Sequence, residues 1–133
     1  MQEYRLREAA QLLGVSDDTV RRWADRGRFT TRTDDAGHRV VEGAELARFA
    51  QELAAANEPA PVGNATSARN RMVGLVTRVV RDTVMAQVEI QAGPHRLVSL
   101  MSREAADDLA LEPGVLAAAV VKSTNVVVET PSP

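Results

Sequence analysis

Residues 6–29 read LREAAQLLGVSDDTVRRWADRGRF, a stretch with two short helical patterns separated by a glycine. The apolar positions at helical spacing are Leu6, Ala9, Ala10 and Leu13 in the first pattern and Val20, Trp23 and Ala24 in the second. Gly14 is expected to end the first helix, Ser16 to cap the second, and Gly27 to end it. Two short helices joined by such a turn are typical of a helix-turn-helix motif.

After this motif the pattern changes to two short strands and a third helix. Residues 29–32 and 38–41 flank the turn-forming sequence DDAG at 34–37, which predicts a two-stranded wing. The apolar face of the following helix consists of Leu46, Phe49, Ala50 and Leu53. Helix, turn, helix and wing in this order predict a small DNA-binding unit whose second helix enters the major groove.

Over nearly all of residues 4–53 this order, with the strings LREAAQLLGVSDDTVRRWADRGRF and GHRVVEGAELARF, resembles the winged helix-turn-helix of MerR-type regulators and phage excisionases. The resemblance implies DNA contacts by Thr19, Arg21, Arg22, His38 and Arg39. Charge alone is only weak evidence for DNA binding, because residues 16–41 carry six arginines against five aspartates. The long coiled-coil helix of full MerR regulators has no counterpart here, so another element must pair the subunits.

The two halves of the chain differ in composition. All four aromatic residues fall within the first 49 positions. Residues 54–66, AAANEPAPVGNAT, combine small residues with two prolines and a glycine, which predicts a helix end followed by a linker. We therefore expect a winged helix-turn-helix domain at 1–55, a linker at 56–66 and a second domain at 67–133. Each domain is near the size at which a single core is marginal, which favours self-association.

In the second half the periodicity changes to two. Val84, Ala86, Val88 and Ile90 alternate with Met85, Gln87, Glu89 and Gln91, as in a half-buried strand. Further strands are expected at 72–80, 96–101, 116–121 and 126–129, with a short helix at 103–109. Five short strands and one helix predict a small OB-like β-barrel, closed or partly closed. The fold class expected for the whole chain is α+β with two domains.

Three segments of the second half carry hydrogen-bond donors suited to an anion. SARNR at 67–71 offers a hydroxyl, guanidinium groups and backbone N–H groups before the first strand. Ser102 precedes the short helix, where N–H groups favour anions. Lys122 and Ser123 follow a very apolar strand, and Lys122 is the single lysine among 16 cations. A compact ammonium suits a small round anion better than a planar guanidinium does, although one lysine alone is weak evidence.

The strings SARNRMVGLVTRV, LVSLMSREAADDLALEPG and AAAVVKSTNVVVE resemble, in order, the Mop or molbindin family of molybdate-binding (TOBE-type) domains. The resemblance covers about residues 67–130, and such domains are also the sensors of ModE-type regulators. It implies a bound molybdate or tungstate, held by Ser67, Ala68 (backbone N–H), Arg69, Ser102, Lys122 and Ser123. These residues are expected to come from two chains, since family sites lie between subunits. Asn70 is expected to fix the turn through side chain–backbone bonds.

Composition and motifs exclude several classes of protein and of functional site. The chain has no cysteine, so disulfides, thiolate metal sites and cysteine nucleophiles are excluded. No nucleophile–base pair, phosphate-binding glycine loop or cation-ligating cluster is found, which predicts a protein that is not an enzyme and holds no metal cation directly. No apolar run is long enough for a membrane helix, and the first residues lack a signal-peptide pattern. A cytoplasmic location without membrane partners is expected.

The combination predicts a transcriptional regulator that responds to molybdate or tungstate and binds double-stranded DNA. By the resemblance it would assemble as a homodimer, or as a hexamer built as a trimer of dimers. Two alternatives remain open at this point. One is a molbindin that stores or buffers molybdate, and the other is a DNA-architecture or excisionase-like factor whose second domain only oligomerises.

Overall fold

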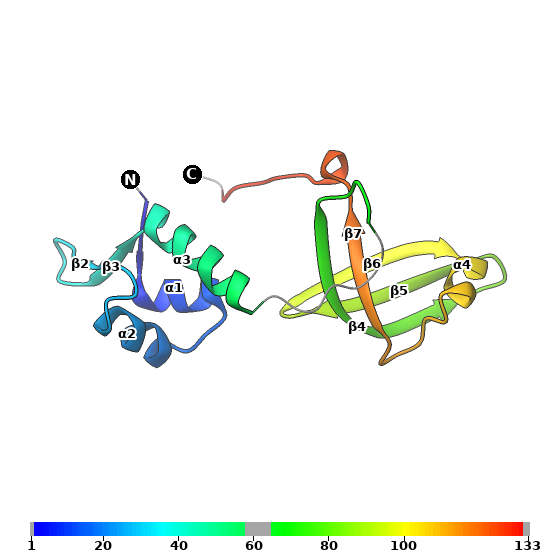
Figure 1. Ribbon diagram of the computed structural model, residues 1–133, viewed down its shortest axis with the longest axis horizontal. Helices are drawn as coiled ribbons and strands as arrows, with labels where there is room; N and C mark the ends of the chain where they lie inside the picture. The colour runs from blue at the N-terminus through cyan, green and yellow to red at the C-terminus, as the bar shows by residue number, and fades with distance from the viewer. Residues whose placement is uncertain (1, 58–64, 132–133) are drawn as a thin grey trace. The chain divides into compact units, whose positions relative to one another are not determined.

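A computed structural model describes residues 2–57 and 65–131, which form two compact units, Met1–Glu58 and Pro59–Pro133 (Figure 1). The linker predicted at 56–66 lies largely outside the described residues. None of the described helices is long and apolar enough to cross a membrane.

The first unit contains three helices, as predicted. Helix α1 (Leu6–Leu13) ends at Gly14, whose φ of 72° is in the left-handed region that favours glycine. Helix α2 (Asp17–Asp25) begins after Ser16, whose hydroxyl oxygen accepts a hydrogen bond from the backbone N–H of Thr19 at 3.2 Å. Helix α3 (Gly43–Ala56) follows the wing.

The wing belongs to a three-stranded sheet of order β1-β3-β2, made of Glu3–Arg5, Arg39–Glu42 and Arg32–Thr33. The sequence predicted β3 within one residue, but the strand predicted at 29–32 overlaps β2 only at Arg32, and β1 was not predicted. Tyr4 lies opposite Val41 in an antiparallel register. A strand of three residues is too short to show a periodicity of two, so only the tertiary pairing defines it.

Aromatic packing organises the core of the first unit. Phe49 of α3 is fully buried, and its ring centroid lies 5.0 Å from that of Phe29 and 5.2 Å from that of Trp23. Trp23 meets Phe49 edge-on, a preferred aromatic geometry. Trp23 is therefore a core residue, as predicted.

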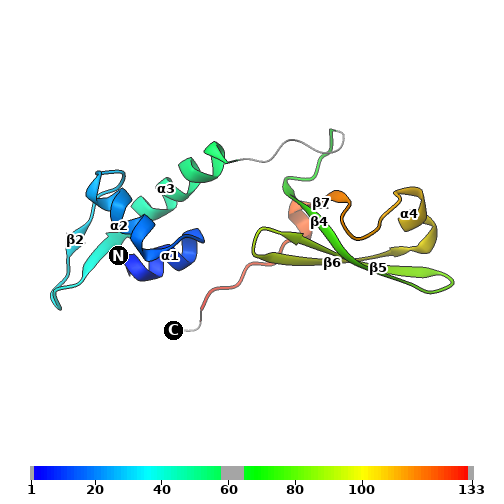
Figure 2. The same ribbon diagram turned by 90° about the horizontal axis from the view of Figure 1, so that it is seen from below.

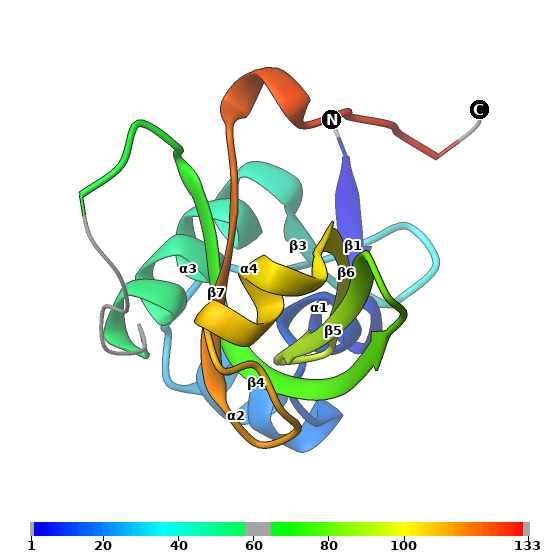
Figure 3. The ribbon, with the colours of Figure 1, turned by 90° about the vertical axis from the view of Figure 1, so that its right-hand side faces the viewer.

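The second unit is a curled four-stranded antiparallel sheet of order β6-β5-β4-β7 (Figures 1 and 3). The strands are β4 (Asn70–Arg81), β5 (Met85–Ala92), β6 (His95–Ser102) and β7 (Leu116–Val121), with helix α4 (Arg103–Asp108) between the last two. A single 3-10 turn, Ser123–Asn125, follows β7. The sheet forms an OB-like half-barrel, in agreement with the predicted α+β class.

The strand predicted at 126–129 is not formed in the structure of the single chain. Residues 126–129 are extended but belong to no strand, and the side chains of Val127 and Val128 are 91% and 83% exposed. The Ser123–Asn125 turn directs this segment away from β7, as Figure 2 shows, so no strand of the same chain pairs with it within the described residues. Four strands therefore make up the sheet where five were expected.

The alternation predicted along β5 holds with two differences. Ala86, Val88 and Ile90 are buried, but Val84 precedes the strand and is 67% exposed. Glu89 is buried although it lies on the other face, because it forms an ion pair with Arg96 and lies in register between β4 and β6.

At Gly74 the backbone of β4 lies close to that of β5. A Cβ atom at this position would lie 2.2 Å from the carbonyl oxygen of Gln91 and 2.8 Å from its carbonyl carbon. Both neighbours are backbone atoms, so they cannot move aside without distorting β5. The curl of the sheet next to the β4 bulge between Val76 and Arg78 thus requires a residue without a side chain.

We predict that Gly74→Ala destabilises the second unit by about 1–3 kcal/mol, the usual range for overpacking. Urea unfolding followed by far-ultraviolet circular dichroism measures this loss. The fluorescence of Trp23, the chain's one tryptophan, is the internal control. Trp23 packs in the core of the first unit, so its unfolding transition should be the same in the variant and the wild type. Equal stability of the variant and the wild type in the circular dichroism transition would contradict the prediction.

Candidate functional site

The pairing of β4 with β7 brings two of the predicted donor segments together. Asn70 lies opposite Val121 in the antiparallel register, so the residues before β4 and after β7 are at the same end of the sheet. The Asn70 side-chain amide donates a hydrogen bond to the Val121 carbonyl at 3.1 Å. The structure therefore brings all the predicted oxyanion residues except Ser102 to one end of this strand pair. Asn70 makes a side chain–backbone bond, but across to β7 and not within the turn where it was expected.

Thr66, which the sequence analysis did not single out, accepts hydrogen bonds from two of the predicted anion-binding groups. Its hydroxyl accepts from the Ala68 backbone N–H at 3.2 Å, and its carbonyl accepts from Arg69 Nη1 at 3.3 Å. An anion that takes the Ala68 N–H must displace the Thr66 hydroxyl. A threonine two residues before the donor is the local signal for such a bond.

The other side chains at this end are open to solvent. Ser67, Arg69, Lys122 and Ser123 are exposed. Within the described residues, no carboxylate forms an ion pair with Arg69 or Lys122. Two cationic groups and two hydroxyls on adjacent strand ends offer hydrogen-bond donors to an acceptor-only anion.

Ser102 lies at the opposite end of the sheet. It pairs with Met85 at the start of β5, next to the end of β4. Strand β4 has 12 residues, a contour of about 40 Å, so Ser102 is far along the sheet from Asn70. Its hydroxyl oxygen accepts from the Ala105 N–H at 3.0 Å, which leaves the O–H group able to donate.

The predicted DNA-contacting residues of α2 lie on its solvent side. Arg21 and Arg22 are exposed, whereas Val20 and Ala24 are buried. Thr19 is half-buried, and its hydroxyl lies 2.9 Å from that of Ser16 and 3.4 Å from Arg22 Nη2. Arg21 and Arg22 are thus available for contact, while Thr19 also serves the helix start.

In the wing, Asp34 organises the turn that presents His38. Its carboxylate accepts hydrogen bonds from the backbone N–H groups of His38 at 2.8 Å and Ala36 at 3.0 Å. The bond from the His38 N–H lowers the pKa of Asp34 below its usual value. The His38 side chain is exposed, with Nδ1 3.7 Å from the same carboxylate.

Arg39, for which the resemblance implies a DNA contact, is held by two partners within the first unit. Its Nη1 donates to Asp25 Oδ1 at 2.8 Å and its Nε donates to Thr31 Oγ1 at 3.0 Å. Asp25 is the last residue of α2, so this ion pair connects the helix to the wing. A partner 14 positions away leaves no local signal in the sequence.

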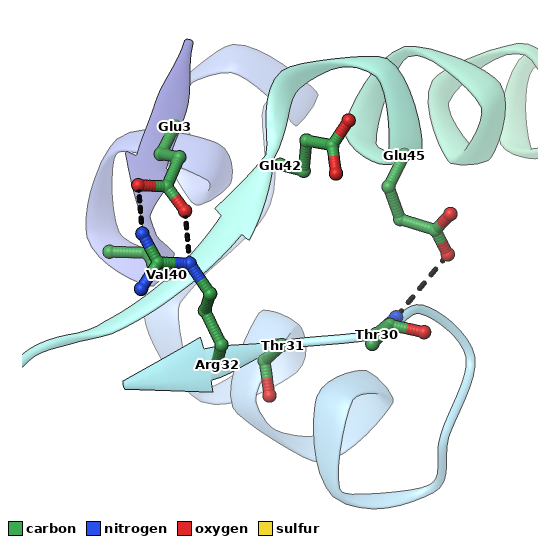
Figure 4. A pocket seen from close by; sticks show the side chains of 7 residues that line it. All are labelled: Glu3, Thr30, Thr31, Arg32, Val40, Glu42 and Glu45. Carbon is green, nitrogen blue, oxygen red and sulfur yellow. Dashed lines mark hydrogen bonds and ion pairs between the residues drawn. The ribbon is translucent and has the colours of Figure 1, made fainter. Parts of the chain in front are cut away.

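A hollow beside the wing is lined by three carboxylates, those of Glu3, Glu42 and Glu45 (Figure 4). Arg32 pairs with Glu3, and Glu45 accepts from the Thr30 N–H at 3.3 Å. Glu45 also pairs with Arg48, so Glu42 is the one carboxylate of this hollow without an ion pair among the described residues. No group of histidine or acidic residues suited to a metal ion occurs in the described part of the chain.

Comparisons with known proteins assign both units. Residues 3–54 match the family model of a helix-turn-helix domain, and residues 66–128 match that of the TOBE domain. Neither model describes a catalytic domain. The geometry and these matches define a protein that joins a helix-turn-helix domain to an OB-like domain of the TOBE class.

The second half is similar to molybdenum-pterin-binding protein 3 of Clostridium pasteurianum, with 36% identity over 63 residues, 47% of this chain and 93% of that protein. The chain belongs, through this half, to the TOBE domain family. A molybdate-binding protein from Sporomusa ovata is 31% identical over 50% of this chain and all of its own, with a TM-score of 0.49. The cytoplasmic molybdate-binding protein ModG, solved with molybdate bound, is 34% identical over 52% of this chain and 50% of its own, with a TM-score of 0.49.

Proposed function

We propose that the protein is a DNA-binding transcriptional regulator that responds to molybdate or tungstate. The observation that carries the proposal is the cluster of Arg69, Lys122 and two serine hydroxyls at one end of the β4–β7 pair, in a chain whose other unit is a helix-turn-helix. The similarity to molybdenum-pterin-binding protein 3 supports the identity of the anion.

The donor set favours a tetrahedral oxyanion. Molybdate is a dianion whose four oxygens only accept hydrogen bonds, so it requires several converging O–H and N–H donors and modest positive charge. Ser67, Ser123 and the Ala68 N–H provide neutral donors, and Arg69 and Lys122 provide the charge. Sulfate has the same charge and shape but shorter bonds, so donors spaced for molybdate are expected to bind it more weakly. Tungstate is nearly the size of molybdate and is expected to bind as well.

The proposed site draws Ser102 from a second chain. Ser102 and the β4–β7 donors lie at opposite ends of the same sheet, so one copy supplies only part of the shell. In a two-fold dimer whose sheets lie antiparallel and end to end, each end of one copy meets the other end of its partner, which yields two equivalent sites. Exposed apolar residues on the sheet, such as Leu75, Leu100 and Leu116, also favour assembly into a dimer or a hexamer built from dimers.

The first prediction of this proposal concerns anion binding. Calorimetric titration of the full chain should give binding of molybdate and tungstate, and at least about tenfold weaker binding of sulfate. Arg69→Ala and Lys122→Ala should abolish binding, because each removes a charged donor. Arg71→Ala is the matched control, since Arg71 is exposed on the same strand one position past Asn70. Normal molybdate binding by Arg69→Ala would refute the site.

The second prediction tests whether each site uses two chains. Ser102→Ala and Lys122→Ala homo-oligomers should each fail to bind molybdate. After the two variants are unfolded and refolded together, mixed dimers contain one intact site, formed by Ser102 of one copy and Lys122 of the other. Calorimetry should then recover about one quarter of the wild-type sites at equal mixing, since half of the dimers are mixed and each has one of two sites. No recovery would place the whole site within one chain.

The third prediction concerns DNA. We propose that Arg21, Arg22 and His38 contact DNA, with Thr19 at the start of the recognition helix. Arg22→Ala should weaken binding to duplex DNA and reduce the slope of log K against log salt by about 0.9, the value for one lost phosphate contact. Arg7→Ala, an exposed residue of α1, is the control.

Mobility shifts with and without molybdate then separate the candidate functions. A change in DNA affinity on addition of molybdate supports the regulator. Anion binding with unchanged DNA affinity would indicate a storage protein, and DNA binding without anion affinity would indicate an architectural or excision factor.

A further inference from the structure

We propose that Asp25 is a positioning residue for DNA binding, which holds Arg39 and thereby fixes the wing relative to helix α2. The inference rests on the DNA-binding function proposed above. It assigns a role to an acidic residue on the recognition helix that neither charge nor motif would single out.

Three elements meet at the Arg39 guanidinium. Nη1 donates to Asp25 Oδ1 at 2.8 Å, and Nε donates to Thr31 Oγ1 at 3.0 Å. Asp25 ends α2, Thr31 directly precedes β2, and Arg39 begins β3. Because the two donors point in different directions within one rigid plane, the pair of bonds fixes both the position and the orientation of the side chain.

The remaining attachments of the wing are to other elements. Phe29 is buried in the core and the Thr30 N–H donates to Glu45 of α3, which anchors the segment leading into the wing. Arg32 of β2 pairs with Glu3 of β1. In the part of the first unit that the structure describes, Arg39 with Asp25 is the only ion pair or hydrogen bond between α2 and the strands of the wing.

A fixed spacing matters because the recognition helix and the wing contact DNA at separate places. Both can engage the same duplex only when their separation matches that of the groove and the neighbouring backbone. A wing that is ordered before binding loses less conformational entropy on binding than a mobile one. The contact between Asp25 and Arg39 thus contributes to DNA affinity without either partner having to touch a base.

The sign of one substitution distinguishes positioning from simple electrostatics. Removal of an acidic group near DNA raises the net positive charge and normally strengthens binding. If Asp25 positions the wing, Asp25→Asn must weaken binding in spite of the added charge. Asp35→Asn is the matched control, because Asp35 is an exposed wing residue with the same change in charge and no ion pair among the described residues.

The experiment uses the full chain and a duplex selected by the wild-type protein from a random-sequence pool, with affinities measured at several salt concentrations. Asp25→Asn should bind about twofold to fivefold more weakly, the factor that an exposed ion pair supports. Asp35→Asn should bind at least as tightly as the wild type. Arg39→Ala should weaken binding with an unchanged salt slope. Asp25→Asn combined with Arg39→Ala should bind at least as tightly as Arg39→Ala alone, because without Arg39 only the effect of the removed negative charge remains.

Measurement well below the unfolding temperature of every variant keeps this role separate from loss of folded protein, since a merely destabilised variant would then bind normally. Asp25→Asn binding as tightly as the wild type, or a salt slope reduced by about 0.9 in Arg39→Ala, would overturn the positioning role. Failure of the wild type to select any duplex would instead overturn the DNA-binding function itself.

Discussion

The antiparallel pairing of β4 with β7 is the contact on which the candidate oxyanion site depends. It sets Asn70 opposite Val121, so two segments that are about 50 residues apart in sequence supply donors at the same place. The close approach at Gly74 keeps β5 against β4 and lets the sheet curl. Neither donor segment alone could bind a dianion strongly, because exposed single charges gain little against water.

Much of the architecture could be predicted from local patterns. Helix ends followed from Gly14 and Ser16, and the strands of the second unit followed from a periodicity of two and from turn residues. Strand β1 was missed because three residues carry no periodicity, and it forms only through pairing with β3. The predicted strand at 126–129 has valine-rich strand composition, but composition does not provide a partner, and pairing decides whether a segment is a strand.

The sequence indicated which residues to consider for the candidate sites, but it did not indicate the contacts that those residues make. Lys122 and the SARN segment stood out because their chemistry is concentrated in a few adjacent positions. The bonds of Arg39 to Asp25 and Thr31 join residues on different elements, and an exposed arginine looks the same in sequence whether it is paired or free. The resemblance to known domains implied which residues form the candidate sites, whereas the structure was needed to find that Arg39 and the Ala68 N–H already have partners.

The separation of Ser102 from the other donors bears on how an anion could regulate DNA binding. A ligand shifts an equilibrium only by its difference in affinity for the two states. A site contained in one rigid half-barrel would be nearly the same in every arrangement of the subunits and could bias none of them. A site shared between opposite ends of two copies is complete in only one arrangement, because a displacement of a few ångströms breaks the bonds from Ser102 while those from Lys122 remain. On the proposed geometry, the anion therefore favours one relative placement of two chains, and any effect on the helix-turn-helix units follows from that placement.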